Sequence, residues 1–432
     1  MISIQESVAL YPKLYFLSEE KKEKLLKKNK ISLNDIIKYY GKVNQRQELE
    51  VNINHDNKNI ITGIKLFINS KKEFEFFKFN TPITIPSLNN IINNSLTFLS
   101  NIYRKIDKEI ENSLTRQLVH CLSVFPKINF RTWVNTTFNQ ITICALCLIF
   151  TNEISNLLED DDYKEKIPLK LYNLIEQRYN QWLAEECSSI THPINRGNII
   201  LTIISHMNII DSLIKNNVVD ISSFNWLKYI RHSWDKSKRK VIIECGEWGN
   251  YQMKKLVPYK SRLLLSPDTD KVFLFNSNCI REKTASIIKV INYKYNNVSY
   301  KEIFEEYCSL FWTNMISIDV ITTPIFEIKS IFDVCTIDKS WIFIDNLDIY
   351  NTNNNDNINN LIYFSKFIQT IQQEIIQIND REKMFCIMGC LNIDDDINKK
   401  CEYLKGSSRL LNFIKPDIDF YFRTTFKLYK NQ

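Results

Sequence analysis

Glycine is scarce in this chain. It occurs seven times in 432 residues, and none of the seven lies between Gly249 and Gly389. Loops that cradle phosphate need several glycines, because only glycine lets the backbone turn with φ > 0 and come close to the oxygens. The glycine-free stretch therefore argues against a phosphate-binding loop there. Asparagine is abundant instead, with 48 residues; we attribute this bias to AT-rich codons, so it says little about function.

Cysteine is absent from the first 120 residues, and the eleven present are scattered from Cys121 to Cys401. The N-terminus is polar and has no apolar segment of the kind found in secretory signals. The sequence therefore predicts reduced thiols in a cytosolic setting. Cys144 and Cys147 have the spacing of a redox or metal pair. Because no second pair or histidine lies near them in sequence, we interpret both as buried apolar residues.

No charge excess and no long hydrophobic run stands out. The net charge is +7, too small over 432 residues for a dedicated nucleic-acid-binding protein. The basic run 236–240 is interpreted as a solvated loop, and the apolar run 141–150 is too short to span a bilayer. We therefore expect neither nucleic acid nor a membrane as a partner. The isolated histidines are interpreted as ordinary surface or half-buried residues: His192, His206 and His232.

The first half of the chain has helical periodicity. Ser18, followed by Glu19 and Glu20, has the pattern of a helix N-terminus. Apolar residues between 96 and 110 recur every three or four positions, as on one face of a helix. An alternating stretch predicts a small β element around 58–80. Further helices are predicted over 134–158, 168–187 and 196–217.

After about residue 218 the pattern changes to short apolar runs separated by helical stretches. This alternation predicts an α/β domain with a mostly parallel sheet. The runs interpreted as buried strands are 262–265, 271–275, 311–316 and 341–344. We therefore expect two lobes that meet near 218–224, the second with a sheet containing Leu263–Leu265 and Phe343–Asp345.

Three segments resemble dynein heavy chains, in that family's order and at roughly its spacing. Residues 11–20, YPKLYFLSEE, are similar to a segment of the family's linker. Phe224–Leu227, with Arg231 and Trp234 after it, resembles the signature at the linker's end. Residues 262–271, RLLLSPDTDK, are similar to the strand and turn that open the first AAA+ module.

The resemblance implies a mixed fold. Residues 1–217 would form mainly α-helical linker bundles, and residues 218–432 an α/β AAA+ module with a parallel sheet. In the family this module binds Mg-ATP. The family's Pro and Thr after the opening strand lie beside the adenine, and they match Pro267 and Thr269.

The family's phosphate-binding loop has no counterpart here. Its expected zone, 289–303, reads KVINYKYNNVSYKEI and contains neither glycine nor a Gly-Lys-Thr sequence. Phosphate binding needs converging backbone N–H groups, a lysine on the β/γ oxygens and a hydroxyl on Mg²⁺. Tyr293 and Tyr295 cannot replace glycines, and we interpret the Lys283–Thr284 pair as a coincidence.

Residues 341–349 resemble the family's Walker B strand. Four apolar residues would bring Asp345 to the C-terminal edge of the sheet, where Mg²⁺ would sit. The family's catalytic Glu falls on Asn346, which cannot accept a proton from the attacking water. Asp348 is a poor replacement. The resemblance therefore implies that no catalytic residue is left.

Residues 385–392 look like the family's sensor strand, with Cys390 at the sensor position, or Asn392 after a small shift. Residues 364–378 and Lys415–Pro416 resemble later segments of the same module. These matches extend the resemblance over nearly the whole chain.

The linker–module junction carries a packing prediction. Trp226 and Trp234 are eight residues apart, about two helical turns, so a helix would project both from nearly one face. With Leu227 and Ile230 they are expected to bury against the start of the second lobe. For these tryptophans, and for Trp341, we prefer core packing to ligand contact.

The leading hypothesis is a dynein heavy chain-like protein that is a non-catalytic structural or assembly element. It implies other dynein heavy-chain segments or dynein complex subunits as partners, microtubules only indirectly, and no cofactor of its own. The location would be cytoplasmic and cytoskeleton-associated, with the axoneme as one such place. Two alternatives stay open: an ATP-binding module with a non-standard phosphate site, favoured by Pro267, Thr269 and Asp345, and an unrelated helical scaffold.

Overall fold

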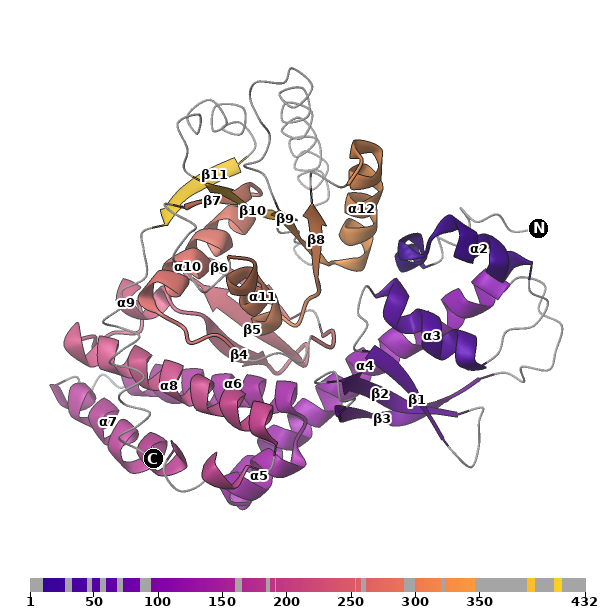
Figure 1. Cartoon of the computed structure of the whole chain (residues 1–432). Coiled ribbons are helices and arrows are strands. Elements are labelled where there is room, and N and C mark those ends of the chain that lie inside the picture. Colours follow the sequence, from indigo (N-terminus) through magenta and orange to yellow (C-terminus); the bar gives the residue numbers. More distant parts are fainter. Residues whose placement is uncertain are drawn as a thin grey trace.

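The computed structural model has a helical part and an α/β part that pack into one continuous core (Figure 1). It describes residues 11–27, 33–44, 49–54, 60–67, 73–85, 95–159, 165–183, 187–190, 192–252, 254–257, 262–290, 300–319, 323–345, 387–392 and 408–413. The similarities noted in 364–378 and at Lys415–Pro416 lie outside these residues.

The N-terminal part begins with short helices and a small sheet. The helices are η1 (Pro12–Phe16), α2 (Glu19–Leu26) and α3 (Leu33–Val43). Ser18 precedes α2 as predicted, although its side chain makes no capping hydrogen bond. The strands are β1 (Leu49–Ile53), β2 (Ile60–Phe67) and β3 (Phe74–Thr84), antiparallel in the order β1-β2-β3. The predicted β element is confirmed and is longer than expected.

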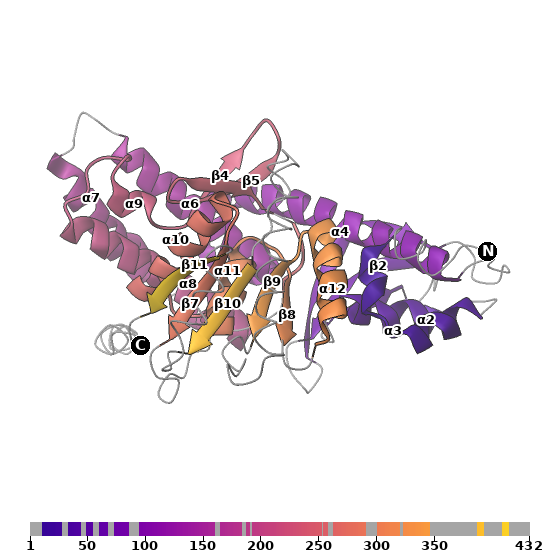
Figure 2. The ribbon, with the colours of Figure 1, turned by 90° about the horizontal axis from the view of Figure 1, so that it is seen from above.

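A set of helices forms the body of the N-terminal part. They are α4 (Ser95–Val124), η2 (Phe125–Lys127), α5 (Phe130–Thr136), α6 (Asn139–Leu158), α7 (Ile167–Leu174), the π-helical turn η4 (Ile175–Tyr179), η6 (Cys187–Ser189) and α8 (Pro193–Lys215). The predicted apolar stripe of α4 is buried, including Leu99, Tyr103 and Ile106. Figure 2 shows α4 running along one side of the molecule, where it contacts β3 and α6.

The two most apolar helices are α6 and α8. By length and composition each could cross a membrane, but more than half of each apolar window is buried within the protein, as in the core helix of a soluble domain. The run 141–150 lies in α6, which has 20 residues. Cys144 and Cys147 are free and buried there, as predicted.

The junction forms strands instead of the predicted helix. After the short helix α9 (Phe224–Leu227) come β4 (Arg231–Asp235), β5 (Lys240–Cys245) and β6 (Trp248–Tyr251), an antiparallel sheet. Asp235 explains the hairpin, because its Oδ1 accepts hydrogen bonds from the backbone N–H groups of Ser237 and Lys238 and so closes a tight turn. Trp226 and Trp234 therefore do not share a helix face. The turn residues 236–239 are exposed, as the solvated-loop interpretation requires.

The C-terminal part contains a five-stranded sheet in which every strand pair is parallel. Its strand order is β11-β7-β10-β9-β8. The elements are α10 (Pro267–Arg281), β7 (Ala285–Val290), α11 (Tyr300–Leu310), β8 (Met315–Asp319), α12 (Ile325–Asp338), β9 (Trp341–Asp345), β10 (Ile387–Asn392) and β11 (Ser408–Phe413). The predicted parallel sheet with Phe343–Asp345 is confirmed.

Two predicted strands are wrong. Leu263–Leu265 form an irregular segment, and 271–275 lie inside α10. The physical reason is a strong helix start: Ser266 and Thr269 form a capping box, and Pro267 occupies the first turn. Of the run 311–316, only the last two residues enter β8.

The β4–β6 sheet lies between α6 on one side and α10 on the other (Figure 1). Helix α12 faces the N-terminal part and contacts η1 (Figure 2). These contacts join elements of the N-terminal and C-terminal parts that are remote in sequence.

Candidate functional sites

The C-terminal edge of the parallel sheet carries two carboxylates. Asp345 ends β9, as predicted, and it pairs in register with Asp319, which ends β8. Sequence reasoning missed Asp319, although MISID and WIFID are both short apolar runs that end in Asp. Among the described residues, no group of three or more His, Cys, Asp or Glu side chains could hold a metal ion. The two carboxylates are therefore at most part of a metal site.

The sensor candidates lie in β10, the strand between β9 and β7. Cys390 pairs in register with Ile288, and Asn392 with Val290, so Asn392 lies at the end of the paired region. The expected phosphate-loop zone joins the end of β7 to the start of α11, and its residues 291–299 lie outside the described part of the chain. Asn346 also lies outside it.

Pro267 and Thr269 have structural roles at the start of α10. Pro267 is exposed in the first turn, whereas Thr269 is buried. The Thr269 hydroxyl donates a hydrogen bond to the Ser266 carbonyl oxygen at 2.7 Å and accepts one from the Ser266 backbone N–H at 2.7 Å. Helix capping therefore already uses the proton of this hydroxyl and one of its two lone pairs.

The junction residues pack in different places. Trp226 is fully buried, with its ring 6.2 Å from that of Phe150 in α6. Trp234 lies half-buried in β4. The Arg231 guanidinium donates to the Gly246 carbonyl oxygen at 3.3 Å, and burial lowers the pKa of Arg231. Trp226 thus packs on an N-terminal helix, and core packing is its role.

Two histidines are buried, contrary to the sequence interpretation. His206 stacks on Phe150 with ring centroids 4.0 Å apart, and burial and the nearby Arg262 lower its pKa well below the ordinary value. The same two causes lower the pKa of His232 to about 3. Both histidines, with Asp270, line a small cavity of about 40 Å³. Burial also raises the pKa of Asp270 to about 7.

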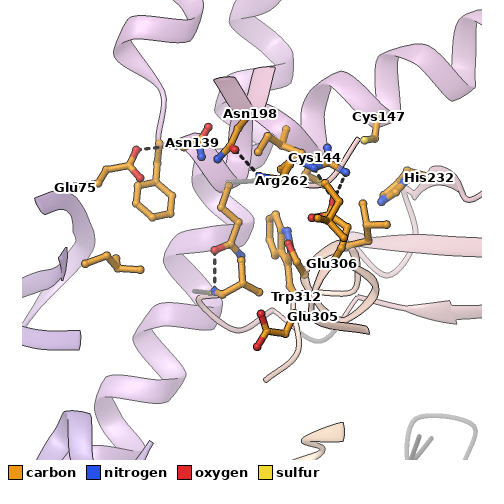
Figure 3. A pocket seen from close by; sticks show the side chains of 18 of the residues that line it. Glu75, Asn139, Cys144, Cys147, Asn198, His232, Arg262, Glu305, Glu306 and Trp312 are labelled. Atoms are coloured by element: carbon orange, nitrogen blue, oxygen red, sulfur yellow. Dashed lines mark hydrogen bonds and ion pairs between the residues drawn. The ribbon is translucent and has the colours of Figure 1, made fainter. Parts of the chain in front are cut away.

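Arg262 links the two parts of the molecule (Figure 3). Its Nε donates to Glu306 Oε1 on α11 at 2.7 Å, and its Nη1 donates to Thr202 Oγ1 on α8 at 2.6 Å. Its backbone N–H donates to Asn198 Oδ1 at 2.8 Å. Arg262 and Glu306 are both buried, so the pair is held in a low-dielectric environment.

Beside this ion pair is a cavity of about 510 Å³ between the helical and α/β parts. Its apolar wall includes Phe138, Ile143, Leu263, Leu310 and Trp312. Its polar wall includes carboxylates from opposite parts of the chain, Glu75 from β3 and Glu302 and Glu305 from α11. No sequence motif indicated this cavity, because its walls come from residues that are far apart in sequence.

Glu75 and Asn139 lie next to each other on the cavity wall (Figure 3). The backbone N–H of Asn139 donates to Glu75 Oε1 at 2.8 Å. Burial raises the pKa of Glu75 to about 7, although this hydrogen bond and the nearby Asn195 side chain act in the opposite direction. Glu75 Oε2 and Asn139 Oδ1 are buried and have no hydrogen-bond partner among the described residues.

Comparison with known proteins finds several dynein heavy chains. The flagellar inner arm I1 complex Dynein-1-beta heavy chain of Chlamydomonas reinhardtii is 27% identical over 145 residues, which is 33% of this chain and 3% of the relative. Dynein axonemal heavy chain 10 of Homo sapiens is 24% identical over 151 residues, again 33% and 3%. Dynein heavy chain-like protein 1 of Plasmodium falciparum is 24% identical over 257 residues, 54% of this chain and 5% of the relative.

No protein-family model matches the chain. The chain spans only a small part of the length of these curated relatives. All three are dynein heavy chains or heavy chain-like by name, and the motifs in the sequence point to the same family. The chain is therefore a divergent relative of dynein heavy chains.

Proposed function

We propose that this protein is a non-catalytic structural or assembly element of a dynein motor. In this proposal residues 1–217 correspond to the C-terminal part of the linker, and residues 218–432 to a degenerate first AAA+ module. The fold is compatible with that division, because a helical part precedes an α/β part with an all-parallel sheet. The partners would be other dynein heavy-chain segments or subunits of the dynein complex, and contact with microtubules would be indirect.

The observation that carries the proposal is that the sheet has the strand end expected of a nucleotide site, whereas the loop expected to hold the phosphates lacks the residues for it. The sheet supports a nucleotide-site assignment, since β9 delivers Asp345 to the edge where ligands of parallel α/β sheets bind. The connection from β7 to α11, where the phosphates would be held, contains no glycine. Backbone N–H groups that converge on phosphate need that conformational freedom. Asn346 removes the proton acceptor as well.

The names of the relatives support a cytoskeletal location. One belongs to a flagellar inner arm complex and another is axonemal. We infer a cytoplasmic, cytoskeleton-associated protein, with the axoneme as the specific compartment to test first. Imaging of the tagged full chain in a ciliated cell would test this inference.

The second candidate function is ATP binding through a non-standard phosphate site. Asp319 favours it, because it places a second carboxylate in register with Asp345 at the sheet edge. Two carboxylates could hold Mg²⁺ together with substrate phosphates. Pro267 and Thr269, the proposed adenine contacts, give ATP binding weaker support than their sequence match suggested. The Thr269 hydroxyl already takes part in capping α10.

Calorimetric titration of the full chain with Mg-ATP separates the two functions. A non-catalytic element should bind no more tightly than about 1 mM, roughly −4 kcal/mol, which adenine burial alone would supply. Asn346→Glu should not create hydrolysis, because the phosphates would remain unheld. A micromolar dissociation constant that is lost in both Asp345→Ala and Asp319→Ala would instead establish the ATP-binding function.

A further inference from the structure

We propose that the cavity between the helical and α/β parts binds an organic monocation, a molecule with one ammonium group on an apolar body. The cavity volume of about 510 Å³ falls within the range of small-molecule sites. Such sites combine a mostly apolar wall with a few polar groups that fix the ligand's orientation. The polar groups here are acceptors and carboxylates, and they determine which ligand fits.

The unpaired acceptors indicate a hydrogen-bond donor. Asn139 is only 6% exposed, and its Oδ1 has no hydrogen-bond partner among the described residues. The adjacent Glu75 Oε2 also has no partner within hydrogen-bond geometry among the described residues, although the Asn195 side chain is near enough to lower the pKa of Glu75. A buried acceptor without a donor is destabilising, because it has lost its hydrogen bonds to water. A ligand ammonium has three donors, so one group could serve both oxygens.

The charge of the walls indicates a cation. The acidic side chains that line the cavity are Glu75, Glu302, Glu305 and Glu306, and the basic one is Arg262, which is paired with Glu306. His232 also lines the cavity, and its lowered pKa of about 3 keeps it neutral. Among the described residues that line the cavity, carboxylates therefore outnumber basic side chains, which favours a cationic ligand over an anionic one.

The apolar wall indicates the rest of the ligand. Phe138 and Ile143 come from the helical part, and Leu310 and Trp312 from the α/β part. A ligand body between them would bury apolar surface on both parts and so hold them together. The binding site is consequently a product of how the two parts dock.

The test uses the purified full chain and a matched pair of probes, phenylbutylamine and phenylbutanol. The two share the apolar body and differ in the ammonium. A ligand-observed NMR titration should give a dissociation constant on the order of 0.1–1 mM for the amine. The alcohol should bind at least tenfold more weakly. Equal binding of the two probes, or no binding of the amine, would overturn the proposal.

Two variants locate the site. Glu75→Gln keeps an acceptor for the Asn139 N–H but removes the charge, so it should weaken amine binding at least tenfold and leave the alcohol unaffected. Ile143→Trp should fill the cavity and abolish binding of both probes. Glu20→Gln removes an exposed carboxylate on α2 and should change nothing. Amine affinity that survives both Glu75→Gln and Ile143→Trp would mean that the cation binds elsewhere, which contradicts the proposal.

A pH series adds an independent readout. Because the pKa of Glu75 is about 7 in the free protein, a cation that needs the ionised carboxylate should bind roughly tenfold more tightly at pH 8 than at pH 6. Glu75→Gln should remove most of this dependence. The amine-binding results do not depend on the Mg-ATP titration. The cavity proposal can therefore fail while the proposed function stands, and the proposed function can fail while the cavity proposal stands.

Discussion

The carboxylate of Asp338 is the best place to test how the two parts of the molecule are held together. It lies at the end of α12 and forms ion pairs with Lys13 Nζ at 3.1 Å and with Lys255 Nζ at 2.7 Å. Its side chain is 15% exposed and that of Lys13 is 7% exposed. Lys13 also pairs with Asp107 at 3.1 Å. Because Lys13 belongs to η1 and Asp107 to α4, the network joins the N-terminal part to α12.

The structure gives the size of the effect of Asp338→Asn. Burial alone would raise the pKa of Asp338, but Lys13 and Lys255 lower it from 3.8 to about 2. This lowering of the pKa corresponds to roughly 2 kcal/mol of stability at neutral pH. The folded pKa lies below the unfolded one, so this contribution is present above about pH 4 and is lost as the pH falls towards 2. Leaving Lys255 without its partner adds to the cost, since an unpaired buried charge is expensive.

Urea denaturation at pH 7 would measure this prediction. Asp338→Asn should lower the free energy of unfolding by about 2–4 kcal/mol, whereas Glu23→Gln on the exposed side of α2 should change it by less than about 0.5 kcal/mol. A double-mutant cycle with Lys13→Met would isolate the ion pair across the two parts. An Asp338→Asn protein as stable as the parent, or a coupling energy near zero, would refute the role given to this network.

Three further predictions concern packing, capping and titration. Trp226→Ala should lower the free energy of unfolding by about 3–5 kcal/mol, because the ring is fully buried. Trp234→Ala should lower it clearly less, because that ring is only half-buried. Equal losses of stability in denaturant titrations would contradict the placement of the two rings. Ser266→Ala should destabilise by about 1 kcal/mol through loss of the α10 cap, and an unchanged denaturation midpoint would show that the cap is dispensable. Burial raises the pKa of Glu75 from 4.5 to about 7, so the protonated carboxyl contributes its full share of stability below about pH 4.5, and this share is lost as the pH rises through 7. Glu75→Gln should therefore flatten the dependence of the free energy of unfolding on pH over that range. An unaltered dependence from pH 4 to pH 8 would count against a buried Glu75.

Local chemistry explains which predictions succeeded. Helical spacing on α4 predicted which of its residues are buried, since period and burial are properties of one element. The strand at 341–344 was predicted because four consecutive apolar residues suit a strand covered on both faces. The short apolar runs at 262–265 and 271–275 were wrongly interpreted as strands. The capping box at Ser266 was readable in the sequence, and it begins a helix where a strand was expected.

Other features depended on residues that are remote in sequence. The spacing of Trp226 and Trp234 fits a helix, but the turn closed by Asp235 and the pairing of β4 with β5 hold Trp234 in a strand. Periodicity cannot separate these outcomes, because the partner strand decides between them. The burial of His206 likewise follows from stacking on Phe150 of another helix.

By itself, the sequence determined the family resemblance, the missing glycines and the change from helical to α/β pattern, since each is a property of consecutive residues. Only the tertiary structure decided the register that sets Asp319 beside Asp345, the Lys13–Asp338 ion pair and the cavity where Glu75 faces α11. These arise where elements distant in sequence dock against one another. An apolar face shows that an element needs a partner, but only packing in three dimensions selects which partner it meets.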